Sequence, residues 1–293
     1  MIVPKQDIIE ITGIADSVAL DSSHKAVERE IKNYCGWEIE SFTYKNQLLD
    51  GTGSDKIWPG PKNITALIRA SDSLETAINF KHSTASSNAY GVVTYTDRVP
   101  ISLGLVVADG TTESSTTELF ATYTTMTTLV AQINARSGNG WSAELNDSKF
   151  GIMASTNLIE KDNIYAGTED GTDPGWSELM KPGTPVGGVT VERTEGGLFR
   201  SSCWPSGTKN IPVTYTAGWT TANMPDDIQG VIIHYVQIDY NKTQQGGGGI
   251  KSFSLLELDI EYETSGTESS SSGFAIGDAR SILDTRYRIG TIV

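Results

Sequence analysis

The chain has 293 residues, 38% of them hydrophobic, with 30 glycines and a net charge of −14 at pH 7. This length allows one large domain or two of ordinary size, and the Gly- and Ser/Thr-rich composition favours a β-rich, loop-rich protein over a helical bundle. So acidic a chain should repel free nucleic acid, because phosphate contacts need Lys and Arg. It is still compatible with a passage along which DNA slides without sticking.

The cysteines and the apolar runs indicate where the protein is made. Cys35 and Cys203 are the only cysteines, and their separation fits neither a zinc motif nor a disulfide framework, so we expect buried thiols in a reducing compartment. The first residues lack the basic start and apolar core of a secretion signal. The longest apolar run, around 231–236, is interrupted by His234 and is too short to span a membrane. We expect synthesis in the cytoplasm and no membrane partner.

The N-terminal part reads as a helix followed by a small antiparallel unit. Apolar residues at helical spacing predict a helix over 21–35, capped by Asp21 or Ser22 and ended by Gly36. The sequence DGTGSDK then forms a turn, and PGPKNITALIRAS leads from a rigid turn into a strand. The strands expected in this part lie at residues 38–49, 57–58 and 64–69.

The amino-acid composition changes after Ser71, and the chain is rich in Thr, Ser and Gly as far as residue 200. Alternation predicts strands at 91–96 and 101–107, and TMTTLVAQINAR predicts a helix over 125–136. The segments WSAEL and KFGIMAS are expected to pair as a hairpin. Because the stretch has about the size of a small domain, we interpret residues 76–199 as an inserted β-rich domain containing one helix.

From about Phe199 the composition is again like that of the N-terminal part. A strand is expected at 211–216 and a helix at 225–242. Pro225 suits the first helical turn, and the two acids after it suit the positive end of the helix dipole. The apolar residues of this helix cover more than one stripe, so it needs partners on both flanks, and a neighbouring subunit can supply some of them. The residues assigned to this core or subunit helix are Ile228, Val231, Ile232, Tyr235 and Val236.

No motif in the chain indicates catalysis, a cofactor or a metal, and we predict none of the three. The sequence holds no HExxH, P-loop or GxSxG, and its three histidines are scattered. The acidic turns DGTGSDK and TEDGTDPG lack the ligand number of a calcium loop. The loop KTQQGGGGIK follows a helix instead of preceding one, which argues against a phosphate cradle. Paired carboxylates that cleave a glycoside can lie far apart in a chain, and no particular pair is indicated here.

The order of these elements resembles a known family. A helix ending in an aromatic pair, the DGTGSDK turn and PGPxxI are followed by VTYTAGW, MPDDIQGVIIHYVQIDYNK, a glycine loop with KSFSLLELDIEYE, and SILDTRYR. This order resembles the tailed-bacteriophage head–tail connector (head completion, or neck adaptor) proteins over about residues 8–75 and 200–293. It implies an α+β fold, a small helical connector core with an antiparallel strand unit. That core is discontinuous, 1–75 and 200–293, and is interrupted by the insert.

The resemblance implies a structural virion protein and no enzyme. Its expected place is the virion neck, in a ring of about a dozen copies below the portal that joins the DNA-filled head to the tail and extends the DNA channel. The implied partners are the portal, a downstream neck or tail-completion protein, and double-stranded DNA passing without sequence-specific binding. Candidate channel or subunit residues are Gly246, Gly247 and Lys251. Candidate portal-docking residues are Arg280, Leu283, Arg286, Tyr287 and Arg288.

The insert keeps an alternative open. Its stretch TTELFATYTTMTTLVAQINARSGNGWSAELNDSKFGIMAS is similar to a small strand–helix–hairpin module of flagellar hook-associated and other phage structural proteins, which implies a decorated assembly surface. The alternative function is a capsid-surface or tail protein whose β insert binds a host glycan or stabilises the shell. The six tryptophans are interpreted first as core or subunit contacts and second as sugar-stacking platforms.

Overall fold

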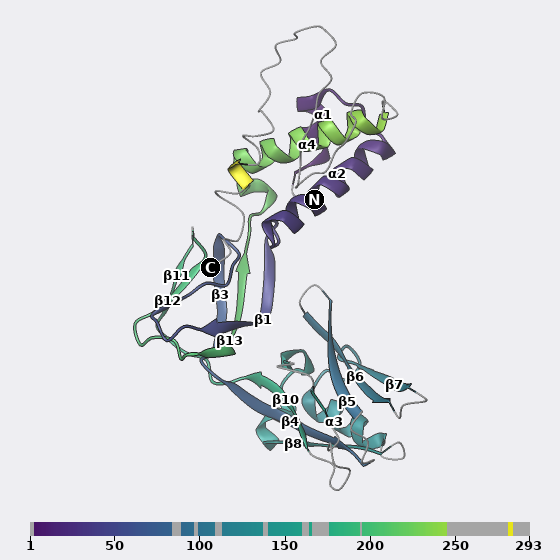
Figure 1. Ribbon diagram of the computed structural model, residues 1–293, viewed down its shortest axis with the longest axis vertical. Helices are drawn as coiled ribbons and strands as arrows, with labels where there is room; N and C mark the ends of the chain where they lie inside the picture. Colours follow the sequence, from purple (N-terminus) through teal and green to yellow (C-terminus); the bar gives the residue numbers. More distant parts are fainter. Residues whose placement is uncertain are drawn as a thin grey trace.

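The chain is an α+β protein with helices at one end, two sheets in the middle and a second β-rich body at the other end (Figure 1). The structure is a computed structural model. It describes residues 3–83, 89–96, 99–108, 113–136, 140–159, 164–165, 176–193, 195–244 and 281–283. The predicted glycine loop at 245–249 and the predicted strand at 251–263 lie outside these residues.

The helical end contains α1 (Lys5–Thr12), α2 (Val18–Cys35) and α4 (Asp226–Gln244). The end of α2 lies beside the start of α4, since the rings of Trp37 and Trp219 have centroids 5.6 Å apart. The two helices therefore pack antiparallel. Their shared core consists of buried aliphatic side chains, including Leu20, Val27, Ile31, Ile228, Val231, Ile232 and Val236.

The ends of α2 follow from its capping residues. Its start lies three residues before the predicted one, because the Ser17 hydroxyl accepts a hydrogen bond from the Leu20 amide at 3.2 Å and so caps the helix. Asp21, predicted as a cap, instead lies in the first turn. Gly36 ends the helix as predicted, in the left-handed conformation with φ of 78°.

Two three-stranded sheets enclose the central core. One has the order β1 (Phe42–Gly51), β13 (Gly207–Ala217), β3 (Ile64–Ala70), and all its pairs are antiparallel. The other has the order β11 (Val189–Glu192), β12 (Gly197–Arg200), β2 (Lys56–Ile57). Tyr44 and Tyr215 face each other across β1 and β13 with their rings stacked 4.9 Å apart. Other buried residues of this core are Ile57, Leu198, Trp204, Ile211 and Val213.

The second β-rich body also contains two sheets and one helix. Its sheets have the orders β10 (Ser177–Pro182), β4 (Leu74–His82), β8 (Trp141–Leu145) and β7 (Glu113–Leu119), β6 (Val99–Ala108), β5 (Ala89–Thr96), β9 (Ile164–Tyr165). The helix α3 (Met126–Ala135) confirms the predicted one and begins at a capping box made by Thr125 and Thr128. The shared core includes Phe80, Leu103, Phe120, Leu129, Ile133 and Trp141.

The predicted hairpin of WSAEL with KFGIMAS is wrong. β8 pairs with β4 instead, and the following residues form two short 3₁₀ turns, η2 (Ser148–Ile152) and η3 (Ser155–Asn157). The Asp147 carboxylate accepts a hydrogen bond from the Lys149 amide at 2.9 Å, which stabilises the first turn. Local side-chain bonds of this kind compete with strand pairing.

The predicted insert, 76–199, contains strands of both β-rich bodies. β11 and most of β12 lie inside this range, yet they pair with each other, β12 pairs with β2, and Leu198 of β12 is fully buried in the central core. The elements that build the insert's own core therefore run from the start of β4 to the end of β10, so the insert spans 74–182.

We expect Ile232→Asp to lower the free energy of unfolding by about 3–5 kcal/mol, because it places an unpaired charge in the helical core. The matched control is Asn241→Asp, at an exposed position of the same helix, with an expected change within about 0.5 kcal/mol. Denaturant unfolding measures both. Equal stability of the two variants would contradict the burial of this face of α4.

Two deletions test where the insert ends. Replacing residues 73–183 by a short Gly/Ser bridge should leave a soluble core, because Ser71 and Pro185 already form a bridge between the two linkers. Replacing 76–199 removes Leu198 and two central strands as well, and should cost at least about 3 kcal/mol more. Denaturant unfolding of both proteins measures the difference. Indistinguishable stabilities would mean that β11 and β12 contribute nothing to the central core.

Candidate functional site

The apolar residues assigned to the core helix lie inside the helical layer of a single chain. They expose at most 5% of their surface and pack with residues of α1 and α2. The partners needed on this side of α4 are thus supplied within the chain, without a neighbouring subunit. The five residues are Ile228, Val231, Ile232, Tyr235 and Val236.

The C-terminal segment contributes one described candidate, Leu283. It is 1% exposed and belongs to the same helical core, so its side chain faces the core and not a partner. The other predicted loop and docking residues lie outside the described residues: Gly246, Gly247, Lys251, Arg280, Arg286, Tyr287 and Arg288.

A groove runs along the opposite side of α4, where α1 borders it. Ile11 of α1 is 67% exposed at its edge. Nothing lies within 4 Å of the position that a Cβ of Gly230 would occupy. Glycine inside a helix costs about 1 kcal/mol relative to alanine, and here it leaves room for close approach of another backbone. The α4 residues that line the groove are Asp226, Gln229, Gly230, Ile233, His234 and Gln237.

His234 is the titratable group of the α1–α4 groove that stands out chemically. Its Nε2 atom is buried and has no hydrogen-bond partner among the described residues. Burial lowers the pKa of the imidazole, which favours the neutral form at pH 7. A neutral ring offers one donor and one acceptor, so His234 can hydrogen-bond to a group that enters the groove.

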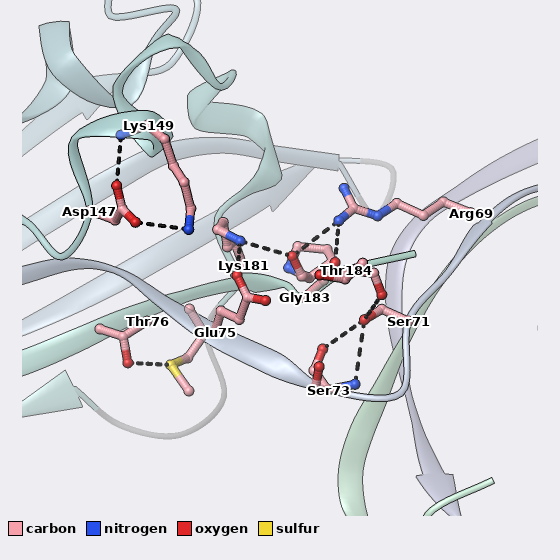
Figure 2. Close-up of polar contacts among 12 residues, drawn as sticks. Arg69, Ser71, Ser73, Glu75, Thr76, Asp147, Lys149, Lys181, Gly183 and Thr184 are labelled. Atoms are coloured by element: carbon pink, nitrogen blue, oxygen red, sulfur yellow. Dashed lines mark hydrogen bonds and ion pairs between the residues drawn. The ribbon is translucent and has the colours of Figure 1, made fainter. Parts of the chain in front are cut away.

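A second polar constellation joins the insert to the central sheet (Figure 2). Arg69, at the end of β3, donates through Nη2 to the carbonyls of Pro182 at 3.1 Å and Gly183 at 2.5 Å. The hydroxyl of Ser71, which is fully buried, lies 3.0 Å from the carbonyl oxygen of Thr184. These bonds tie the linker that enters the insert to the linker that leaves it.

Lys181 anchors the insert side of this junction. Its side chain is 4% exposed, and its Nζ lies 2.5 Å from Glu75 Oε2 and 4.0 Å from the ring centroid of Phe150. A buried ammonium needs such a partner, because its desolvation is otherwise costly. The hydrogen bond from Lys181 holds the pKa of the Glu75 carboxyl below its usual value.

A third contact connects β1 to the insert through a bulge. The register of β1 against β13 shifts between Tyr44 and Gln47, where Asn46 has a φ of 51°. The bulge directs Lys45 to the insert, and its Nζ lies 2.6 Å from Thr156 Oγ1 in η3. Burial lowers the pKa of Lys45. The insert is therefore an arm that is attached to the central sheet at two separate places, the junction around Arg69 and Ser71 and the Lys45–Thr156 contact.

The described residues contain no group of three His, Cys, Asp or Glu side chains that could hold a metal ion. His24 is buried in α2 with its Nε2 2.9 Å from Glu28 Oε1, and His82 lies edge-on to the ring of Trp141. Within the same described part of the chain, no helix is long and apolar enough to cross a membrane.

Comparison with known proteins gives no match to any family model, curated protein or solved structure.

Neither the groove nor the junction was predicted from the sequence. The helix α1 that borders the groove has a local signal, since Pro4 precedes it and Gly13 ends it with φ of 70°. The junction has no such signal, because Arg69 and Lys181 find partners more than one hundred residues away in the chain. Only the folded topology brings them together.

The junction should lose part of its stability in acid. Since the folded-state pKa of Glu75 is lowered, its contribution is present above its unfolded pKa and is lost as the pH falls through the folded value. Between about pH 5 and pH 3, Glu75→Gln should therefore lose less unfolding free energy than the wild type. Unfolding at several pH values measures this. The control is Glu178→Gln at an exposed position of β10, and equal pH slopes for wild type and Glu75→Gln would contradict the assignment.

Proposed function

We propose that the protein is a head–tail connector, a structural virion protein that forms a ring below the portal and joins the DNA-filled head to the tail. One observation supports this most directly. Segments 42–70 and 207–244, far apart in the chain, build one unit in which β13 lies between β1 and β3 and leads into α4, which packs on α2 (Figure 1). This is the order of elements on which the resemblance to connector proteins rests.

The turn between β13 and α4 couples the sheet mechanically to the helices. Gly218 has a φ of 95°, and a Cβ at this position would lie 2.6 Å from the carbonyl oxygen of Glu40 and 2.7 Å from that of Ile39. The next residue, Trp219, donates its amide to the Ile39 carbonyl at 2.9 Å. The Gly-Trp dipeptide therefore has a structural role. It lets two backbones approach closely and so joins the end of the sheet directly to the helices, a connection that a load-transmitting adaptor requires.

The charge and the arm fit the same role. In a connector the strongly acidic chain lets DNA pass without binding, because phosphates find few cations on its surface. The insert projects from the end of the central sheets that lies away from the helices (Figure 1), so it can reach a downstream neck or tail protein while the helices form the ring. Such a protein acts through its interfaces and catalyses nothing.

Immunogold labelling of phage particles tests the location. An antibody against the full chain should label the neck of intact particles and stay on DNA-filled heads that have lost their tails. Preincubation of the antibody with the purified chain is the control and should abolish the label. Label over the capsid faces or at the tail tip would overturn the connector proposal in favour of a capsid-surface or tail protein with a glycan-binding insert.

A further inference from the structure

The outer side of α2 carries a stripe of exposed residues that includes two cations. Positions 18, 22, 25, 29 and 33 follow helical spacing and lie on the side opposite the residues that pack on α4. Val18 is 82% exposed. Lys25 and Arg29 make no ion pair or hydrogen bond with another described residue. We call this the α2 stripe, and it consists of Val18, Ser22, Lys25, Arg29 and Asn33.

The α1–α4 groove lies on the other side of the helical layer and complements this stripe. The α4 residues of the groove lie on the side of the helix away from the face that packs on α2, except that Ile233 is 7% exposed, belongs to the helical core as well, and so forms the floor of the groove. The groove is apolar around Ile11, Ile233 and Gly230, and acidic at its end, where Asp226 is exposed without an ion pair among the described residues. The α2 stripe thus presents an apolar residue, Val18, and then cations, and the groove presents an apolar residue, Ile233, and then an acid, Asp226.

We infer that the α2 stripe of one copy packs into the α1–α4 groove of the next copy. This deepens the proposed ring and rests on it. Two different surfaces on opposite sides of one unit make a head-to-tail contact, and such contacts generate rings when the rotation between copies closes. Copies in a ring of about a dozen differ by a small rotation. The α2 of a neighbour therefore runs antiparallel to α4, as α2 does within the chain.

The antiparallel register is set by equal spacings. Val18 and Lys25 are seven residues apart, as are Ile233 and Asp226, so both pairs span about 10.5 Å along a helix axis. When Val18 lies against Ile233, Lys25 therefore reaches Asp226. Ser22 then lies near Gly230, where two small residues allow the helix backbones to approach closely.

Disulfide trapping tests this contact in the full chain. Ser22→Cys and Gly230→Cys are combined in a Cys203→Ser background, which leaves Cys35 buried. A Cβ at position 230 meets no described atom within 4 Å, so the helix should tolerate the change. Mild oxidation should give a ladder of dimers, trimers and larger species on a non-reducing gel. Each single-cysteine variant should stay monomeric.

Absence of a ladder, or dimers from Ser22→Cys alone, would overturn the inferred contact. Charge reversal gives a second readout. Lys25→Glu with Arg29→Glu should lower the ladder yield on the order of tenfold, and adding Asp226→Lys should restore it, since the pairing is then reversed. An unchanged yield after reversal would also overturn the inference.

The two proposals can fail separately. A ladder from a protein whose antibody labels the capsid faces would keep the contact and remove the connector role. Neck labelling without a ladder would keep the connector role and remove this contact.

Discussion

The pairing of β13 with both β1 and β3 is the constraint on which the rest of the molecule depends. This strand is long, its inner residues Ile211, Val213 and Tyr215 are fully buried, and it brings the C-terminal third of the chain into contact with the N-terminal quarter. The end of β13 also sets the start of α4, because the turn at Gly218 is hydrogen-bonded to the backbone that follows α2. The antiparallel packing of the two long helices is thus a consequence of strand register.

The insert is accommodated because its two ends meet. β4 and β10 are neighbours in one sheet, and Leu74 pairs with Pro182, so chain entry and exit lie side by side. A domain inserted in this way need not disturb the host strands. What the junction adds is stiffness, since moving the two linkers apart would leave the buried Ser71 hydroxyl without its partner and would cost the free energy of a desolvated polar group. A flexible linker would have needed none of these bonds, which favours an arm with a fixed direction.

The predictions from the sequence succeeded where the information is local. The body of α2, its C-terminal Gly36, the helix α3 and the strands β1, β3 and β13 follow from periodicity and from capping or turn residues. They failed where a local bond competes with pairing, as at Asp147. The sequence did not predict the groove or the junction, because the geometry of both sites depends on contacts between segments that are distant in the chain. The buried face of α4 is a further example. The periodicity predicted that the apolar face is broad, but it did not predict that α1 and α2 of the same chain cover this face.

Electrostatics is compatible with the proposed assembly of identical copies, although each copy carries a net charge of −14. At physiological ionic strength the Debye length is about 8 Å, so repulsion between the bulk of two acidic subunits is largely screened. Pairs in direct contact are screened much less, and local complementarity therefore decides which surfaces meet. On α2, Lys32 is already paired with Glu38, whereas Lys25 and Arg29 have no acid partner among the described residues and are available to an external acid. In the proposed ring, two cations on one helix face would thus direct association, while the overall acidic character would keep the same surface from retaining DNA.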